Sequence, residues 1–340
     1  MSLVRRQLGL LLAVALCCFG HRLLALELDY DYDGAEVVFH LIGTKPESRY
    51  NLRIIDLVTD QQIAEITEFE AGSVSGVRNS KWNPDIDEGI FRLVLEVNGE
   101  KFHLDDDELD FRTVQTEFIP VKINRRLGKL HWSLPVAALT RVIAYTDTGL
   151  KVASIRPWTF LPPGNYTESW SFKDADGVKD YRDDPQLNLY AQAYPLPSNI
   201  LIIGEPLLDG FQAIDDFKNL ELTNERYEFD VTLLSQGEGS QSSIQEMQGL
   251  PVLRPGDAVR VSLKESTKHA MGSKRFEVLF YWDDQFLHEE TDSLNPCTFI
   301  FPNVPDFSGK QYLTVNVKDL VGGWGVKTIP VYYLPSKTLQ

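Results

Sequence analysis

Cysteine is scarce in this chain, which has only three in 340 residues. Two of them, Cys17 and Cys18, stand in an apolar segment near the N-terminus. If that segment is removed on export, Cys297 is the single remaining thiol and no disulfide can form within the mature chain. Because extracellular proteins of eukaryotes usually carry several disulfides, the shortage favours a bacterial exported protein.

Positive charge is also scarce, since 33 Lys and Arg face 49 Asp and Glu and leave a formal net charge of −16. A surface of this sign repels phosphate backbones, so nucleic acid is not an expected partner. The hydrophobic share of 43% is enough for packed cores. No long apolar run follows residue 25, so we expect no stable membrane insertion after signal cleavage.

Signatures of the common enzyme classes are missing as well. The sequence contains no nucleophile elbow, no glycine-rich phosphate loop and no metalloprotease motif. Its six histidines are scattered without the spacing of metal ligands. We therefore expect no enzymatic activity and no cofactor. Acidic residues are abundant, which leaves a hydrolase that works through paired carboxylates as an alternative.

Residues 1–25 have the features of a secretory signal peptide. Arg5 and Arg6 form the charged start, residues 8–19 are apolar, and Gly20 or Ala25 supplies a small residue for cleavage. About a dozen apolar residues are too few for a membrane span. We expect the protein to be secreted or periplasmic, with an uncleaved N-terminal anchor as the alternative.

The rest of the chain shows short alternating segments of apolar and polar residues, bounded by turn residues. Residues 37–41, 91–97, 187–193, 276–282 and 312–318 are examples. This period of two is typical of half-buried β-strands, and no segment shows a sustained helical period. We predict an all-β fold of tandem immunoglobulin-like antiparallel β-sandwiches.

The length exceeds that of one ordinary core and predicts several modules. The expected parts are a signal peptide, three sandwiches and a linker before the last sandwich. Their boundaries are residues 1–25, 26–112, 113–205, 206–226 and 227–340. The acidic residues 105–110 are expected to form a solvated loop between the first two sandwiches, and residues 200–203 are expected to form an edge strand.

An internal repeat links the first two sandwiches. In each, a strand and a strand–turn–strand unit precede a glycine-containing loop, a tryptophan, an acidic turn and a long alternating strand. Trp82 and Trp170 occupy equivalent places in this order. A shared order of this kind indicates a diverged duplication.

The second module resembles the immunoglobulin-like domain of flagellar hook-capping proteins. The matching segments are residues 142–149, 161–164, 170–177 and 187–193. The third module resembles a polycystic-kidney-type immunoglobulin-like domain. It does so through the sequence Phe-Tyr-Trp-Asp-Asp at 280–284 and through residues 309–319. These resemblances imply spacing, adhesion or accessory binding roles and no catalytic residues.

Aromatic side chains provide the candidate binding residues. Trp158 and Phe160 stand in an expected loop, and Tyr166 begins an alternating segment, so we predict that these three contact a partner. Aromatic residues in such rows are also common core residues. We expect Trp82 and Trp170 to be core anchors because the repeat preserves them.

Acidic turns provide the candidate metal residues. Asp174, Asp176 and Asp180 form one cluster that could hold a structural calcium ion, and residues 29–34 match the start of a calcium loop. The loop lacks the expected bidentate ligand, since His40 stands at its twelfth position. Asp and Gly also favour plain turns for backbone reasons, and this alternative stays open at both places.

The pattern as a whole predicts a non-catalytic exported protein with a structural or protein-interaction role at the cell envelope or outside the cell. The alternative is a glycan-binding accessory protein. The expected partner is accordingly a protein or a glycan at the envelope.

Overall fold

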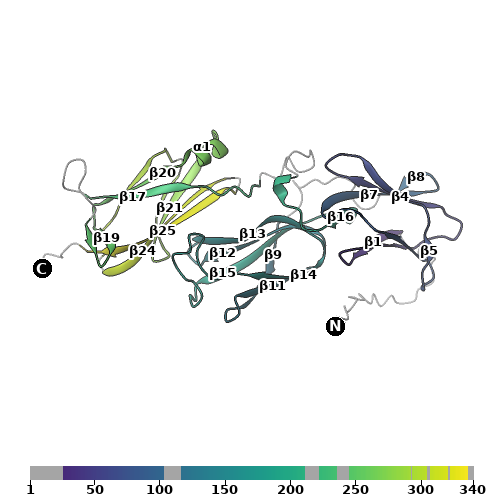
Figure 1. The fold of residues 1–340 in the computed structure, drawn as a ribbon, viewed down its shortest axis with the longest axis horizontal. Coiled ribbons are helices and arrows are strands. Elements are labelled where there is room, and N and C mark those ends of the chain that lie inside the picture. The colour runs from purple at the N-terminus through teal and green to yellow at the C-terminus, as the bar shows by residue number, and fades with distance from the viewer. Residues whose placement is uncertain are drawn as a thin grey trace, which may run out of the picture.

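The computed structural model describes residues 26–102, 116–210, 222–235, 245–291, 293–304, 307–320 and 322–335. The predicted signal peptide and the acidic residues 105–110 lie outside this part of the chain. The described strands form three β-sandwiches that follow one another along the long axis of the molecule (Figure 1). The predicted all-β fold of tandem immunoglobulin-like sandwiches is confirmed. No described helix is long and apolar enough to span a membrane.

The first module packs two antiparallel sheets face to face. One sheet has the order β1-β2-β6-β5 and the other the order β16-β7-β3-β4, with β8 beside β7. The strands are β1 Glu27–Tyr32, β2 Val37–Ile42, β3 Tyr50–Asp56, β4 Gln62–Ile66, β5 Glu70–Ala71, β6 Val77–Trp82, β7 Gly89–Val97, β8 Glu100–Phe102 and β16 Ile200–Ile203. Alternation places Val37, Phe39 and Leu41 of β2 in the core, where they are completely buried.

The second module repeats this arrangement. Its sheets have the orders β10-β11-β14 and β13-β12-β15-β9. The strands are β9 Glu117–Pro120, β10 Lys122–Asn124, β11 Lys129–Leu134, β12 Ala138–Thr146, β13 Lys151–Leu161, β14 Gly164–Ser169 and β15 Leu187–Pro195. The order β1-β2-β6 corresponds to β10-β11-β14, and β16-β7-β3-β4 corresponds to β9-β15-β12-β13. The predicted internal repeat is therefore visible in the pairing of the strands.

Strand β16 belongs to the first module, although it follows the second in the chain. It pairs antiparallel with β7, with Leu201 opposite Phe91. The residue range 113–205 predicted for the second sandwich thus includes a strand that completes the first. No strand from residues 26–102 takes this edge position, and a whole domain separates β16 from β7. Local sequence patterns carry no information on such a distant partner.

Both faces of β16 are buried, because successive side chains point to opposite sides of a strand. Leu201 and Ile203 pack in the core of the first module. Ile200 and Ile202 pack in a separate cluster with residues of the second module, including Leu139. One strand therefore ties the first two modules together.

The described part of the predicted linker, residues 206–210 and 222–226, lies along β13 of the second module. The Phe160 N–H donates to the Pro206 carbonyl at 2.8 Å. The Trp158 N–H donates to the Asn224 side-chain oxygen at 2.6 Å, and the Asn224 amide donates to the Trp158 carbonyl at 3.1 Å. These hydrogen bonds fix the segment to the second module.

The third module has sheets of order β17-β20-β23 and β18-β19-β25-β24-β21-β22, in which β19 and β25 are parallel. The strands are β17 Phe229–Leu234, β18 Glu246–Met247, β19 Leu250–Leu253, β20 Ala258–Leu263, β21 Phe276–Trp282, β22 Gln285–Glu290, β23 Cys297–Ile300, β24 Gly309–Asp319 and β25 Trp324–Tyr333. Two short helices, α1 Glu265–Met271 and the 3-10 turn η1 Leu208–Gly210, were not predicted from the sequence. Helix α1 has fewer than three turns, which is too short for a clear helical period.

Candidate ligand-binding site

The turn between β21 and β22 fixes the third module against the second. Asp284 in this turn is 3% exposed. Its carboxylate accepts a hydrogen bond from the Tyr181 hydroxyl at 2.7 Å and forms an ion pair with the Lys179 ammonium. Its backbone carbonyl accepts a hydrogen bond from the Thr148 hydroxyl. Burial and the adjacent Asp284 carboxylate raise the pKa of Tyr181, so the phenol stays protonated as a donor.

Further contacts extend this junction along the two modules. Leu279 and Tyr281 of β21 belong to the same hydrophobic cluster as buried residues of the second module. The Lys151 N–H donates to the Asn316 side-chain oxygen at 3.2 Å. Apolar packing and hydrogen bonding together hold the second and third modules against each other.

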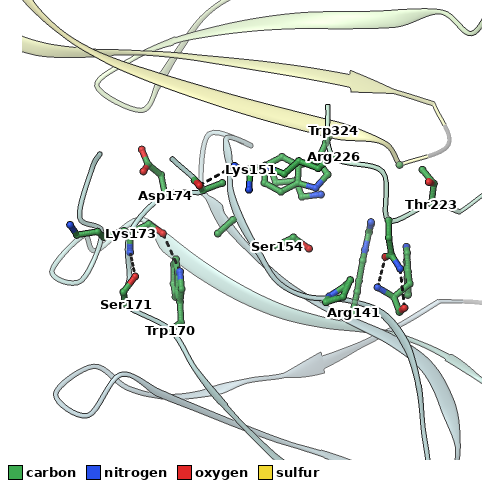
Figure 2. A pocket seen from close by; sticks show the side chains of 16 residues that line it. Arg141, Lys151, Ser154, Trp170, Ser171, Lys173, Asp174, Thr223, Arg226 and Trp324 are labelled. Carbon is green, nitrogen blue, oxygen red and sulfur yellow. Dashed lines mark hydrogen bonds between the residues drawn. The ribbon is translucent and has the colours of Figure 1, made fainter. Parts of the chain in front are cut away.

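A cavity of about 370 Å³ lies beside this junction (Figure 2). Its walls come from β12, β13 and residues 170–175 of the second module, from residues 223–226, and from the start of β25. Its lining includes four basic residues and three tryptophans: Arg141, Lys151, Lys173, Arg226, Trp158, Trp170 and Trp324. In a chain with a net charge of −16, this is a local concentration of positive charge.

Arg141 stands on β12 and reaches from the second module towards the third. Its Nε donates to the Gln192 side-chain oxygen at 2.5 Å, and its guanidinium carbon lies 4.5 Å from the centroid of the Trp158 ring. A Cβ atom at Gly322 would be in ordinary van der Waals contact with an Arg141 terminal nitrogen, at 3.8 Å. Burial lowers the pKa of Arg141 from its usual value.

Lys151 is the second partly buried cation of the cavity. Its ammonium lies 3.9 Å from the centroid of the Trp324 ring, a cation–π contact between the modules. Burial, reinforced by the nearby Arg141 guanidinium, holds the pKa of Lys151 well below its usual value. Among the described residues, neither Arg141 nor Lys151 forms an ion pair with a carboxylate.

Asp174 is the acidic residue of the cavity lining, and its carboxylate is already occupied. It accepts the N–H groups of Val178 at 2.7 Å and Lys179 at 3.2 Å. The side chain is 5% exposed. Among the described residues, Asp174 forms no ion pair with Arg141 or Lys151.

The predicted exposure of Trp158 and Phe160 is wrong, because these side chains are 1% and 0% exposed. Residues 157–160 do not form a loop but continue β13, where Phe160 pairs with Leu139 of β12. Trp158 contributes to the cavity wall only from its buried position. Tyr166 is half-buried on β14 and stacks on Trp132 at 5.7 Å, so the structure does not bring the three aromatic residues into one surface.

The repeated tryptophans are partly buried and pack against cores, as expected. Trp82 contacts Phe91 edge-on at 6.0 Å. Trp170 packs against the cluster of the second module and donates its indole N–H to the Lys173 carbonyl at 3.1 Å. Trp170 also lines the cavity.

The structure does not bring the predicted calcium ligands together. Asp174 holds its own turn, Asp176 accepts the Thr328 N–H of the third module at 3.1 Å, and Asp180 accepts the Arg182 N–H at 2.8 Å. Within the described ranges, no three His, Cys, Asp or Glu side chains are grouped to hold a metal ion. The same holds at residues 29–34, where the Asp33 carboxylate accepts the N–H groups of residues 35 and 36.

Replacing Asp174 with alanine is expected to destabilise the protein by about 1–3 kcal/mol, because two N–H groups at a buried turn lose their acceptor. Asp180→Ala, which removes a carboxylate from an exposed turn, should cost less than half of that. Adding calcium should leave the melting temperature of the wild type unchanged. Thermal unfolding with and without calcium measures all three. A calcium-dependent rise that Asp174→Ala abolishes would contradict this role for the turn.

Sequence reasoning missed Arg141 and Lys151, although one signal was present. Arg141 interrupts a stretch whose other residues, 137–144, are small or apolar apart from Thr140. A single cation in a segment of this kind can mark a functional position. The position of Lys151 against Trp324, however, depends on how two modules dock, and the sequence of neither module shows it.

Comparisons with known proteins give no family. No protein-family profile matches the chain, and no curated protein matches it. Among solved structures, the central fibronectin-III array of RIM-binding protein is 10% identical, with 92% of this chain and 96% of that one covered and a TM-score of 0.19. Chicken CNTN1 FN1-FN3 domains are 9% identical, covering 90% and 98%, with a TM-score of 0.19.

A trypsin-activated alpha-2-macroglobulin from Escherichia coli is 9% identical, with a TM-score of 0.21. The alignment covers 92% of this chain but only 24% of that protein, so the chain spans about a quarter of its length. Identities and scores this low establish neither a family nor an activity. The fold assignment rests on the sheets themselves.

Proposed function

We propose that this chain is an exported, non-catalytic protein whose three sandwiches act as a rigid spacer or interaction element at the cell envelope. The observation that carries the proposal is the shared strand β16, whose two faces are buried in different clusters. Domains joined by small polar interfaces usually move relative to one another. Strand β16 follows the second module in the chain but pairs in the first, and so opposes such motion at that junction. The buried Asp284 carboxylate opposes it at the junction between the second and third modules.

We also propose two finer assignments. The second module has its Leu-Pro-Pro-Gly bend between β13 and β14 and its acidic turn directly after Trp170. Both features agree with membership of the hook-capping immunoglobulin-like domains. The third module has Phe280–Asp284 at the end of β21, beside β24, which agrees with the polycystic-kidney type. These resemblances imply spacing, adhesion or accessory binding roles and carry over no catalytic residues.

Cell fractionation tests the exported location. The full chain with a C-terminal tag should be recovered from the periplasm or the medium, and deletion of residues 1–25 should retain it in the cytoplasm. Recovery of the complete tagged chain from the cytoplasm would contradict export. Turnover of any substrate in an ester and glycoside library would contradict the non-catalytic role.

Glycan binding is a second candidate function. The exposed aromatic surface first expected for it, around Trp158 and Phe160, is buried. The cavity between the second and third modules favours it instead, since small-ligand sites are commonly found where domains meet. Its tryptophans are suited to a charged sugar, as are Arg141 and Lys151, which form no ion pair within the described ranges.

A further inference from the structure

Four basic residues line the cavity beside the junction, and the two that are partly buried, Arg141 and Lys151, lack an anion among the described residues. Arg141 uses its Nε for Gln192, and no acceptor within the described chain takes the hydrogen atoms of its two terminal nitrogens. Within the described part of the chain, the Lys151 ammonium contacts the face of Trp324, at 3.9 Å from the ring centroid. Partly buried charges without a partner are costly. An incoming anion would remove that cost while forming charge-assisted hydrogen bonds.

We propose that this cavity binds a carboxylate-bearing sugar of the uronic acid type, with its carboxylate between Arg141 and Lys151. The planar guanidinium of Arg141 matches the geometry of a carboxylate, and the ammonium of Lys151 supplies a second, compact charge. Both residues line the same cavity, Arg141 from β12 and Lys151 from the start of β13. Repulsion between them is relieved when an anion binds between them.

The remaining lining suits the body of a sugar. Ser154 and Thr223 offer hydroxyl groups, and the half-buried Trp170 offers an aromatic surface for the apolar C–H face of the ring. Figure 2 shows Ser154 between Lys151 and Arg141 in projection, with Trp170 on the side opposite Arg141. A volume of about 370 Å³ lies at the small end of the usual range for ligand pockets, roughly 300–1,000 Å³. A single sugar unit is the expected occupant.

A peptide is a poorer fit, because the edge of β13 beside the cavity is occupied. The Val152 carbonyl accepts the Ala175 N–H at 3.1 Å. The N–H groups of Trp158 and Phe160 donate to Asn224 and Pro206. Addition of a peptide strand requires a run of free backbone groups, and this edge offers only a short one between these contacts.

Calorimetric titration of the wild-type protein with glucuronate, glucose and inorganic phosphate is the direct test. Glucuronate is expected to bind with a Kd of about 1 mM or tighter. Glucose should bind at least tenfold more weakly, since it lacks the carboxylate. Phosphate should also bind at least tenfold more weakly, since it lacks the sugar ring. Absence of glucuronate binding, or equal binding of glucose or phosphate, would overturn the proposal.

Variants locate the site. Lys151→Gln should weaken glucuronate binding by about tenfold or more, because a charge-assisted hydrogen bond is lost. The matched control Lys122→Gln removes the same charge from an exposed position on β10 and should bind within about twofold of the wild type. Unchanged binding by Lys151→Gln would overturn the assignment.

A second variant covers the case in which Lys151→Gln weakens the junction. Ser154 is exposed in the cavity wall, so Ser154→Phe should fill the cavity without removing a charge. It should abolish glucuronate binding at an unchanged melting temperature, and retained binding would overturn the proposal. The inference gives a ligand class to the second candidate function and does not depend on export. A lack of glucuronate binding to the purified protein is therefore distinguishable from a lack of export in the fractionation experiment.

Discussion

Replacing Leu201 with alanine is expected to destabilise the first module by about 3 kcal/mol, within the 2–5 kcal/mol typical of buried leucines. Leu201 is completely buried in the core of a module that ends, by sequence, a hundred residues earlier. The loss should appear in native-state hydrogen exchange as faster exchange of the β3 and β7 amides, since β7 pairs with both β3 and β16. The amides of β24 in the third module should be unaffected.

Leu207→Ala is the matched control for this effect. Leu207 lies six positions later in the same segment, and its side chain is 47% exposed. Its replacement should change the opening free energy obtained from exchange of the β7 amides by less than about 0.5 kcal/mol, as is usual for exposed positions. If Leu201→Ala left the first module as stable as Leu207→Ala does, β16 would not be part of its core.

Asp284→Asn is expected to weaken the junction between the second and third modules by about 3 kcal/mol. The change leaves the Lys179 ammonium without its partner in a site where its side chain is only 15% exposed. Removing one member of a buried ion pair commonly costs 3–5 kcal/mol. Asparagine tolerates the positive φ of 71° at this position, so the turn itself should survive. In urea denaturation, the third module should then unfold in a transition separate from that of the other two modules.

Asp283→Asn removes the same charge from the neighbouring residue and provides the control. Its carboxylate accepts the Tyr312 N–H at 2.9 Å within the third module rather than across the junction. Because burial raises the pKa of Asp283, loss of its charge should cost little. Equal destabilisation by both variants would show that the junction does not depend on the Lys179–Asp284 pair.

Local patterns were sufficient to predict the sandwich fold, most strands and the repeat. Alternation identified β2, β7, β15, β21 and β24, and Asn98-Gly99, a residue pair favoured in tight hairpin turns, connects β7 to β8. These features depend on a period of two and on turn chemistry, both of which a single segment contains.

The candidate site could not be predicted in the same way. Residues 157–160 were expected to form an exposed loop. They instead continue β13, an edge strand, and an edge strand tolerates a proline such as Pro157. The cavity is formed where two modules dock, and β16 pairs across an inserted domain. Both features depend on contacts between distant parts of the chain, which hydrophobic periodicity does not encode.

The rigidity of both junctions is tested most directly by a distance measurement between spin labels on the first and third modules. Val74 and Leu320 are 64% and 80% exposed and can be replaced by cysteine in a chain whose three native cysteines are changed to serine. Pulsed electron paramagnetic resonance should give one narrow distribution of distances between the two labels, and Asp284→Asn should broaden it. A broad distribution in the protein with an intact Asp284 would contradict a rigid arrangement of the three modules.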